Sequence, residues 1–301
     1  MNREGEKQGG TYLLAGNTVT ARPLEPALYL VATPIGNLGD ITLRALETLA
    51  AVDVVACEDT RTSRVLLNRY GIRTKTLSYH DHNQAKAGPR LIDAIRQGKS
   101  VALITDAGTP LVSDPGERLS AEARAAGIRI VPIPGASAVL AALTSAGLPA
   151  ARFFFEGFLP AKSGQRKARL ASLASLDATL VFCEAPHRLS ETLADMVTVF
   201  GDARVVAVCR ELTKTFEEVV VLPSVELAAR YPADAQVRGE IVLVVEPPKE
   251  AEAKLADVDL LLVSLTRQMP ASKAAAEASR LTGVSKSELY QRILSMKNDG
   301  A

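Results

Sequence analysis

Tryptophan is absent from this sequence of 301 residues, and aromatic residues make up only 4% of it. Proteins that hold single-stranded nucleic acid by base stacking need a platform of aromatic side chains. The composition therefore argues against such a platform. The remainder is an ordinary globular mixture, with 47% hydrophobic and 23% charged residues.

Cysteine is also scarce, since Cys57, Cys183 and Cys209 are the three that occur. They lie far apart and form neither a C-x-x-C pair nor the dense framework of a small secreted domain. We therefore expect a protein of the reducing cytoplasm.

Long hydrophobic runs are missing, because none approaches the roughly 20 residues of a membrane-spanning helix. The opening residues, MNREGEKQGG, are polar, unlike a signal peptide. We expect no membrane association, and a disordered extension over residues 1–26. The net charge of +1 excludes a polybasic or strongly acidic tail protein but not a local basic face.

Familiar nucleotide and metal motifs are absent too. No G-x-G-x-x-G follows the first expected strand. Gly98-Lys99-Ser100 lacks the earlier glycine of a phosphate loop and follows a helical pattern. His80-Asp81-His82-Asn83 has two histidines and no nearby cysteine, a poor closed zinc site. We expect a polar turn there and no metal.

Short apolar runs alternate with helical patterns from Leu28 onward. This alternation predicts an α/β domain with a mainly parallel sheet over residues 27–147. A second α/β domain is expected over residues 148–247, where two successive strands near the end indicate a mixed sheet. The expected strands lie at 28–32, 53–57, 74–78, 100–105, 129–132, 153–158, 179–183, 204–210, 217–222 and 240–246.

The remaining residues, 248–301, are expected to form a linker and a helical segment. Pro247-Pro248 and alternating charges predict the linker, over 246–256. A helix over 272–281 is expected to end at Gly283, and Ser285-Lys286-Ser287-Glu288 has the spacing of a capping box. Two such helices resemble a helix-turn-helix. The pattern fits two interpretations equally well: a surface that binds nucleic acid, and a helical hairpin that only packs against the rest of the protein.

Three loops rich in glycine and proline follow expected strands, at residues 33–40, 105–116 and 132–138. Ligands of open α/β sheets bind beyond the carboxyl ends of the strands. Glycine lets the backbone approach a ligand closely, and proline stiffens a loop. Three such loops at one edge favour a small-molecule site over three ordinary turns.

Six segments in and around these loops carry a family resemblance: PIGNLGDITLRAL (34–46), CEDTR (57–61), DAGTPLVSDPG (106–116), PIPGASA (132–138), FEGFLP (155–160) and CEAPHR (183–188). They resemble the class III, or tetrapyrrole methylase, family of S-adenosylmethionine-dependent methyltransferases, and most closely its ribosomal RNA small subunit methyltransferase I branch. The resemblance covers about residues 28–246, and the C-terminal helices also fit that branch.

The resemblance implies two α/β domains with S-adenosylmethionine in the cleft between them. It implies 2′-O-methylation of a cytidine ribose in the decoding region of 16S rRNA, on the 30S subunit, by a homodimer. It leaves open the exact target nucleotide and whether naked rRNA suffices.

The resemblance also implies which residues contact the cofactor. In Gly108-Thr109-Pro110, Thr109 replaces the acid of a G-D-P signature that is common in the wider family. Asp106, just upstream, is therefore expected to pair with the cofactor's ammonium group. The expected contacts are Pro34, Gly36, Asp106, Gly108, Thr109, Pro110, Val112, Ser137, Ala138, Phe182 and Cys183.

The attacking 2′-hydroxyl must lose its proton, so a nearby acceptor would assist the transfer. Glu58, Asp59, Glu184 and His187 lie at expected strand ends and are the candidates. The same segments fit salt-bridged turns equally well, so no single base is singled out.

Phosphate contacts are expected from seven cations, and they would make RNA affinity fall with salt. A solvated helix face explains the cations between 161 and 170 equally well. The seven are Arg61, Arg64, Lys162, Arg166, Lys167, Arg169 and Arg188.

Two other functions fit parts of the sequence. The same fold and cofactor could serve a tetrapyrrole or a protein side chain, but the basic segment 161–170 and the C-terminal helices argue against that. A nucleic-acid-binding regulator would leave CEDTR and CEAPHR without a role.

Overall fold

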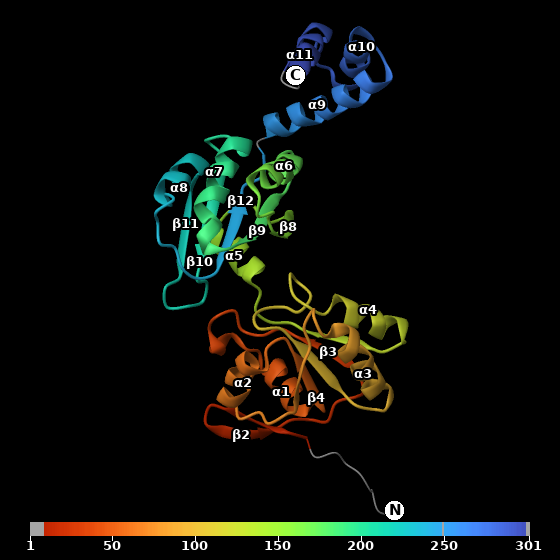
Figure 1. The fold of residues 1–301 in the computed structure, drawn as a ribbon, viewed down its shortest axis with the longest axis vertical. Helices are drawn as coiled ribbons and strands as arrows, with labels where there is room; N and C mark the ends of the chain where they lie inside the picture. Colours follow the sequence, from red (N-terminus) through yellow and green to blue (C-terminus); the bar gives the residue numbers. More distant parts are fainter. Residues whose placement is uncertain (1–8, 249, 299–301) are drawn as a thin grey trace, which may run out of the picture. The chain divides into compact units, whose positions relative to one another are not determined.

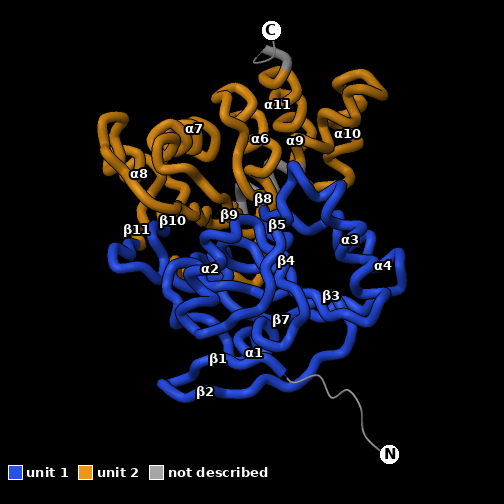
Figure 2. The backbone as a smooth tube through the Cα atoms, turned by 60° about the horizontal axis from the view of Figure 1, so that its bottom comes forward, with its two compact units in different colours: residues 1–145, 209–218 blue, residues 146–208, 219–301 orange. Residues whose placement is uncertain are grey.

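The computed structural model describes residues 9–248 and 250–298, and Figure 1 shows their fold. The chain divides into two compact units, coloured separately in Figure 2. Unit 1 holds residues 1–145 and 209–218, and unit 2 holds residues 146–208 and 219–301. Within the described ranges, no helix has the length and apolar character needed to cross a bilayer.

Unit 1 contains a five-stranded sheet in the order β5-β4-β6-β3-β7. All four strand pairs are parallel, which confirms the expected parallel α/β sheet. Parallel pairing places the loops that follow the strands at one edge of the sheet. The strands are β3 Leu28–Val31, β4 Val54–Cys57, β5 Thr76–Ser78, β6 Val101–Ile104 and β7 Ile130–Ile133.

Helices cover both faces of this sheet, because successive strand side chains point to opposite faces. Tyr29 and Val31 pack in one core cluster with α1 (Leu43–Ala51) and α2 (Thr60–Arg69). Leu28, from the same strand, packs in another cluster with α3 (Gln84–Arg96) and α4 (Glu117–Ala125). A buried sheet of this kind explains the nearly continuous apolar runs of the strands.

The N-terminal segment corrects one expectation. Residues 1–8 lie outside the described residues, but from Gly9 the chain is ordered, so the disordered extension over 1–26 is wrong there. Strands β1 (Thr11–Leu14) and β2 (Asn17–Thr20) form an antiparallel hairpin. Ala15 and Gly16 both have positive φ, 48° and 81°, as a tight two-residue hairpin turn requires. Tyr12, only 7% exposed, anchors the hairpin in the core of unit 1.

Unit 2 contains a second five-stranded sheet, in the order β11-β10-β12-β9-β8. β8 runs parallel to β9 and β12 runs antiparallel to it, which confirms the expected mixed sheet. Side chains of α6, α7 and α8 share one core cluster with this sheet. The elements are β8 Phe153–Phe158, α6 Ser163–Leu173, β9 Thr179–Glu184, α7 Leu189–Phe200, β10 Val205–Arg210, β11 Glu218–Pro223, α8 Ser224–Arg230 and β12 Ile241–Val245.

Residues 209–218 depart from the expected domain limits. They lie within the expected second domain, 148–247, but cluster with unit 1. The reason is local packing, because Thr213 and Lys214 lie directly against Gly36. The chain passes from unit 1 to unit 2 near the end of α5 (Ala138–Ala146).

The C-terminal segment forms three helices, α9 (Glu250–Gln268), α10 (Ala271–Thr282) and α11 (Lys286–Asn298). The expected linker over 246–256 is therefore wrong from Glu250 onward, since its Ala, Glu, Lys and Leu residues favour helix. The caps are as expected: Gly283 is left-handed at φ 76°, and Ser285 Oγ accepts a hydrogen bond from the Glu288 amide at 3.3 Å. The three helices share their own small core.

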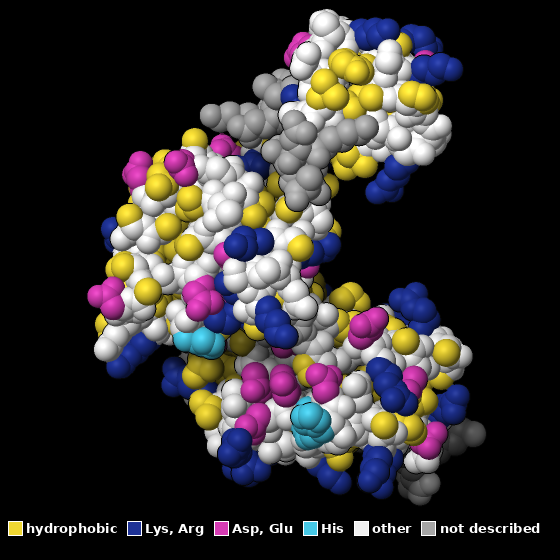
Figure 3. All heavy atoms as spheres, turned by 45° about the horizontal axis from the view of Figure 1, so that its top comes forward, with side chains coloured by type: hydrophobic (Ala, Val, Ile, Leu, Met, Phe, Trp, Pro, Cys, Tyr) yellow, Lys and Arg dark blue, Asp and Glu magenta, His cyan; other side chains and the backbone are white. Residues whose placement is uncertain are grey.

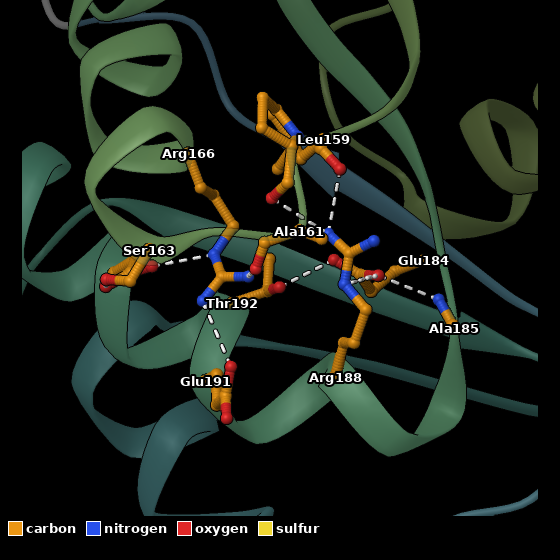
Figure 4. Close-up of polar contacts among 11 residues, drawn as sticks. Leu159, Ala161, Ser163, Arg166, Glu184, Ala185, Arg188, Glu191 and Thr192 are labelled. Atoms are coloured by element: carbon orange, nitrogen blue, oxygen red, sulfur yellow. Dashed lines mark hydrogen bonds and ion pairs between the residues drawn. The ribbon is translucent and has the colours of Figure 1, made fainter.

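One buried ion pair joins α6 to α7 in unit 2 (Figure 4). Arg166 on α6 is fully buried and donates from Nε to Asp195 on α7 at 2.6 Å. The same guanidinium donates to the Ala161 carbonyl at 3.1 Å, and Ser163 donates to the second Asp195 oxygen at 2.9 Å. A buried charge is tolerated only with such partners. This network fixes how the two helices pack.

Removing the acid of this pair should destabilise the protein strongly. Asp195→Asn removes the buried counter-charge of the Arg166 guanidinium and leaves only the largely exposed Glu191 carboxylate as its acidic partner, at a cost of about 3–5 kcal/mol in the free energy of unfolding. Urea unfolding followed by circular dichroism measures it, since the chain has no tryptophan. Glu191→Gln is the control, because that carboxylate also pairs with Arg166 but is 72% exposed. Equal, small losses in both variants would contradict the prediction.

Candidate active site

The three glycine- and proline-rich loops meet at the carboxyl edge of the unit 1 sheet, as expected. Thr33 and Gly108 exchange two backbone hydrogen bonds, at 2.8 and 3.0 Å, which join the loops after β3 and β6. Thr109 Oγ1 donates to the Ala136 carbonyl at 3.2 Å, which joins the loop after β6 to the loop after β7. These bonds make the three loops one preorganised surface.

The loop after β6 has an unusual backbone. Leu111 and Ser113 are left-handed, with φ of 74° and 62°, although neither is glycine. Gly116 has φ 132°, and a Cβ there would lie 2.6 Å from a Leu103 side-chain carbon. Such conformations cost free energy and are concentrated at functional sites. The strain marks this loop as the centre of the candidate site.

Most of the expected cofactor residues lie at this edge. Pro34 and Gly36 follow β3, and Ser137 and Ala138 stand at the beginning of α5. The loop after β6 supplies the largest set, namely Asp106, Gly108, Thr109, Pro110 and Val112.

The other two expected cofactor residues lie on β9 of unit 2. The Phe182 side chain is fully buried in the core of unit 2, and the expected contact of this residue with the cofactor stays a prediction. Cys183 is half-buried, and its expected contact stays a prediction.

Carboxylates gather around the same loops, and Figure 3 shows acidic side chains side by side next to a histidine. The Asp59 amide donates to Asp106 Oδ1 at 3.2 Å, linking the loops after β4 and β6. Burial, together with the charge of Glu58, raises the pKa of Asp114 to about 6. Burial also raises the pKa of Asp106. Loss of hydration at this edge therefore makes these carboxyl groups hold their protons more tightly than carboxyl groups in water do.

Glu58 and Asp59 are neighbours with opposite behaviour. Burial, followed by the charges of Asp106 and Asp81, raises the pKa of Glu58, while His80 lowers it. The Glu58 carboxylate accepts no hydrogen bond in the described part of the chain. Hydrogen bonds from Arg61 lower the pKa of Asp59 to about 2. Glu58 is thus the more basic and more available carboxylate.

The two candidate bases of unit 2 differ in accessibility, and Figure 4 shows the polar contacts of one of them, Glu184. Glu184 is 2% exposed and accepts hydrogen bonds from Thr192 Oγ1 at 2.6 Å and the Ala185 amide at 2.8 Å. It also forms an ion pair with Arg188 at 3.3 Å. This arrangement contradicts its expected role as proton acceptor, because an enclosed, fully bonded carboxylate cannot reach a substrate. His187 is exposed on a short 3-10 turn, Pro186–Arg188, and its role stays a prediction.

The seven expected phosphate-binding cations divide into two groups. The expectation for Arg166 is wrong, since its guanidinium is fully buried. Arg169 forms two bonds of 2.6 Å with Glu156, and Arg188 donates to the carbonyls of Leu159 and Pro160. Arg61 is paired with Asp59. The other three cations form no side-chain hydrogen bond or ion pair among residues 9–248 and 250–298: Arg64, Lys162 and Lys167.

The loop over residues 211–217 packs at the carboxyl edge of the unit 1 sheet, a position that the sequence pattern does not predict. A Cβ at Gly36 would lie 2.4 Å from Lys214 Cγ, so the lysine side chain covers the loop after β3. Lys214 Nζ donates to Glu211 at 2.8 Å. Glu211 and Thr213 are left-handed, with φ of 51° and 66°. The sequence signal was a charged turn between two strands, which does not show where the turn packs.

Comparison with protein families agrees with this geometry. Residues 27–228 match the model described as tetrapyrrole (corrin/porphyrin) methylases. Residues 252–297 match the RsmI C-terminal HTH domain. That second match supports the helix-turn-helix interpretation of α10 and α11.

Curated relatives resemble the chain along most of its length. It is 60% identical over 286 residues to a ribosomal RNA small subunit methyltransferase I from Mesorhizobium japonicum, covering 95% of this chain and 97% of the relative. The Escherichia coli O157:H7 protein of the same name is 47% identical over 269 residues, covering 89% and 94%.

Solved structures share the fold at lower identity. Uroporphyrin-III C-methyltransferase from Thermus thermophilus, complexed with S-adenyl homocysteine, aligns with a TM-score of 0.54 and 20% identity, over 73% of this chain and 97% of that one. Diphthine synthase aligns at 0.57 and 16% identity, over 73% and 89%. The chain belongs to the tetrapyrrole methylase family and, within it, to the ribosomal RNA small subunit methyltransferase I group.

Proposed function

We propose that this methyltransferase transfers the methyl group of S-adenosylmethionine to the 2′-hydroxyl of a cytidine in the decoding region of 16S rRNA, on the 30S subunit. The observation that carries the proposal is 60% identity across 95% of the chain to a ribosomal RNA small subunit methyltransferase I. The joined loops at the carboxyl edge of unit 1 support it, because that edge is where open α/β sheets bind ligands.

The residues of this edge fit the cofactor chemically. S-adenosylmethionine carries a positive sulfonium and an ammonium group, and Asp106 and Asp114 are acidic side chains of the loop after β6 that suit a cationic ligand. Asp106 is exposed, so its carboxylate is open to a ligand. We assign the ammonium contact to Asp106 and backbone contacts to Gly108, Thr109 and Val112.

The cofactor supplies an activated methyl group, so the protein has to position the hydroxyl and accept its proton. We assign the proton to Glu58, whose raised pKa and free carboxylate suit a base. As the ribose oxygen bonds to the methyl carbon, the proton passes to a Glu58 oxygen. The carbon–sulfur bond breaks with its electron pair left on sulfur.

Several further expectations belong to the same proposal. Arg64, Lys162 and Lys167, together with the C-terminal helices, are assigned to the rRNA backbone. We also propose that the protein forms a homodimer and acts in the cytoplasm.

Methyl transfer to rRNA tests the function directly. Tritiated S-adenosylmethionine is incubated with 30S subunits from cells that lack this gene, with naked 16S rRNA in parallel. We expect label on one ribose, mapped by the nuclease resistance of the methylated linkage. No label on either RNA, with intact cofactor binding, would redirect the assignment to tetrapyrrole or protein acceptors.

Asp106→Asn should weaken cofactor binding about tenfold to a hundredfold, the loss expected for one charge-assisted hydrogen bond. Isothermal titration with S-adenosylmethionine measures the dissociation constant. Asp93→Asn is the control, because Asp93 is an exposed aspartate near the end of α3. An unchanged constant in Asp106→Asn would remove Asp106 from the ammonium site.

Glu58→Gln should lower the methyl-transfer rate by about 10²–10⁴-fold while cofactor affinity changes little. A base works only when ionised, so wild-type activity should rise with pH through a pKa above the usual glutamate range. The variant should lose that limb of the profile. Glu117→Gln, an exposed glutamate on α4, serves as control. If the activity of Glu58→Gln still rises with pH as that of the wild type does, the titrating group is Asp114 or Asp106 instead.

A further inference from the structure

Unit 1 carries a hollow of about 500 Å³ that none of the sequence motifs points to. It lies beside α1 and the edge strand β7, which Figure 2 shows in the same unit. Its apolar lining includes Leu24, Val131 and Ile133, and its charged lining includes Arg22, Arg44 and Arg129. The volume falls within the range of small-ligand sites.

The arginines of this hollow differ in their partners. Arg22 forms an ion pair with Glu47 at 3.4 Å. Arg44 and Arg129 form neither an ion pair nor a side-chain hydrogen bond in the described part of the chain. The lining therefore holds two guanidinium groups with open donors, against one unpaired carboxylate, Glu25. A guanidinium group with open donors suits phosphate, which one guanidinium can bind through two parallel hydrogen bonds.

The edge strand disfavours one obvious occupant. The carbonyl groups of Arg129 and Ile133 accept hydrogen bonds from the backbone of the segment that contains β3. The backbone N–H and C=O groups of residues 130 and 132 therefore point away from β3, toward the open edge of the sheet. Residue 132 is proline and has no N–H to offer. A second chain added along β7 would therefore lack a hydrogen-bond donor at this position, which disfavours strand addition there.

The hollow adjoins the candidate active site. Ile133, in its lining, directly precedes the loop that carries Ser137 and Ala138. Thr42, which caps α1, donates from Oγ1 to the Pro134 carbonyl in that loop at 3.4 Å. A ligand that occupies the hollow thus extends toward the carboxyl edge of the same sheet.

We propose that this hollow binds the backbone of the rRNA substrate, with one phosphate on Arg44, another on Arg129 and a nucleotide against Leu24 and Val131. The inference rests on the proposed function, because it assumes an RNA substrate. It places an RNA contact on unit 1 next to the acidic loops, which by themselves repel phosphate.

The test removes both charges, as Arg44→Gln with Arg129→Gln. Binding to 30S subunits is measured over a range of salt concentrations, and cofactor binding by titration. Two lost phosphate contacts should make the slope of log affinity against log salt shallower by about 1.4–1.8. Cofactor affinity should not change. The control pair is Arg90→Gln with Arg124→Gln, exposed arginines on α3 and α4, which cover the other face of the sheet.

Three results would overturn the inference. The first is an unchanged salt slope in Arg44→Gln/Arg129→Gln. The second is an equal change of the salt slope in the control pair, which would show that the overall positive charge of the protein, and not this hollow, sets the slope. The third is a changed sedimentation coefficient of the Arg44→Gln/Arg129→Gln variant with unchanged RNA binding. That result would show that the hollow is a contact between copies of the chain. If the wild-type protein binds cofactor but neither binds nor methylates rRNA, the proposed function itself fails.

Discussion

Parallel pairing in unit 1 is the constraint on which the candidate site depends. Because β3, β4, β5, β6 and β7 all run the same way, the loops that follow them emerge at one edge. The exchanged hydrogen bonds between Thr33 and Gly108 then tie two of those loops into a bridge. An antiparallel β6 would have sent its strained loop to the opposite edge.

The described residues of unit 1 include acidic side chains in one place and unpaired arginines in another, and the two places suit ligands of opposite charge. Burial raises the pKa values of Glu58, Asp106 and Asp114, and the charge of a neighbouring carboxylate raises each of them further, so a cationic ligand beside them would be favoured. The open guanidinium groups of Arg44 and Arg129 favour an anionic one. A methyl donor with positive charge and a polyanionic acceptor need just such a separation, since each would be repelled by the other's site.

Arginine content alone is a poor guide to nucleic-acid binding in this protein. Arg166 and Arg188 are both expected from the sequence to contact phosphate, yet they fix helices and carbonyl groups inside unit 2. A guanidinium has several donors and retains its charge when buried, so it serves as a structural connector as readily as a phosphate ligand. Only the partners of each arginine distinguish the two uses.

Local pattern in the sequence determined the alternating strands and helices, the Gly283 and Ser285 caps, the mixed sheet of unit 2 and the three glycine- and proline-rich loops. These follow from side-chain periodicity and backbone preference, which act over a few residues. Even the hairpin that was missed had a local signal, the Ala15-Gly16 turn between alternating residues.

Tertiary structure alone decided which charged groups meet. It buried Arg166 against Asp195, enclosed Glu184 and Phe182, and laid Lys214 over Gly36. Arg166 and Asp195 are 29 positions apart in the sequence, and Gly36 and Lys214 are far more widely separated. Burial and pairing depend on how whole elements pack, so no motif in the sequence reveals them.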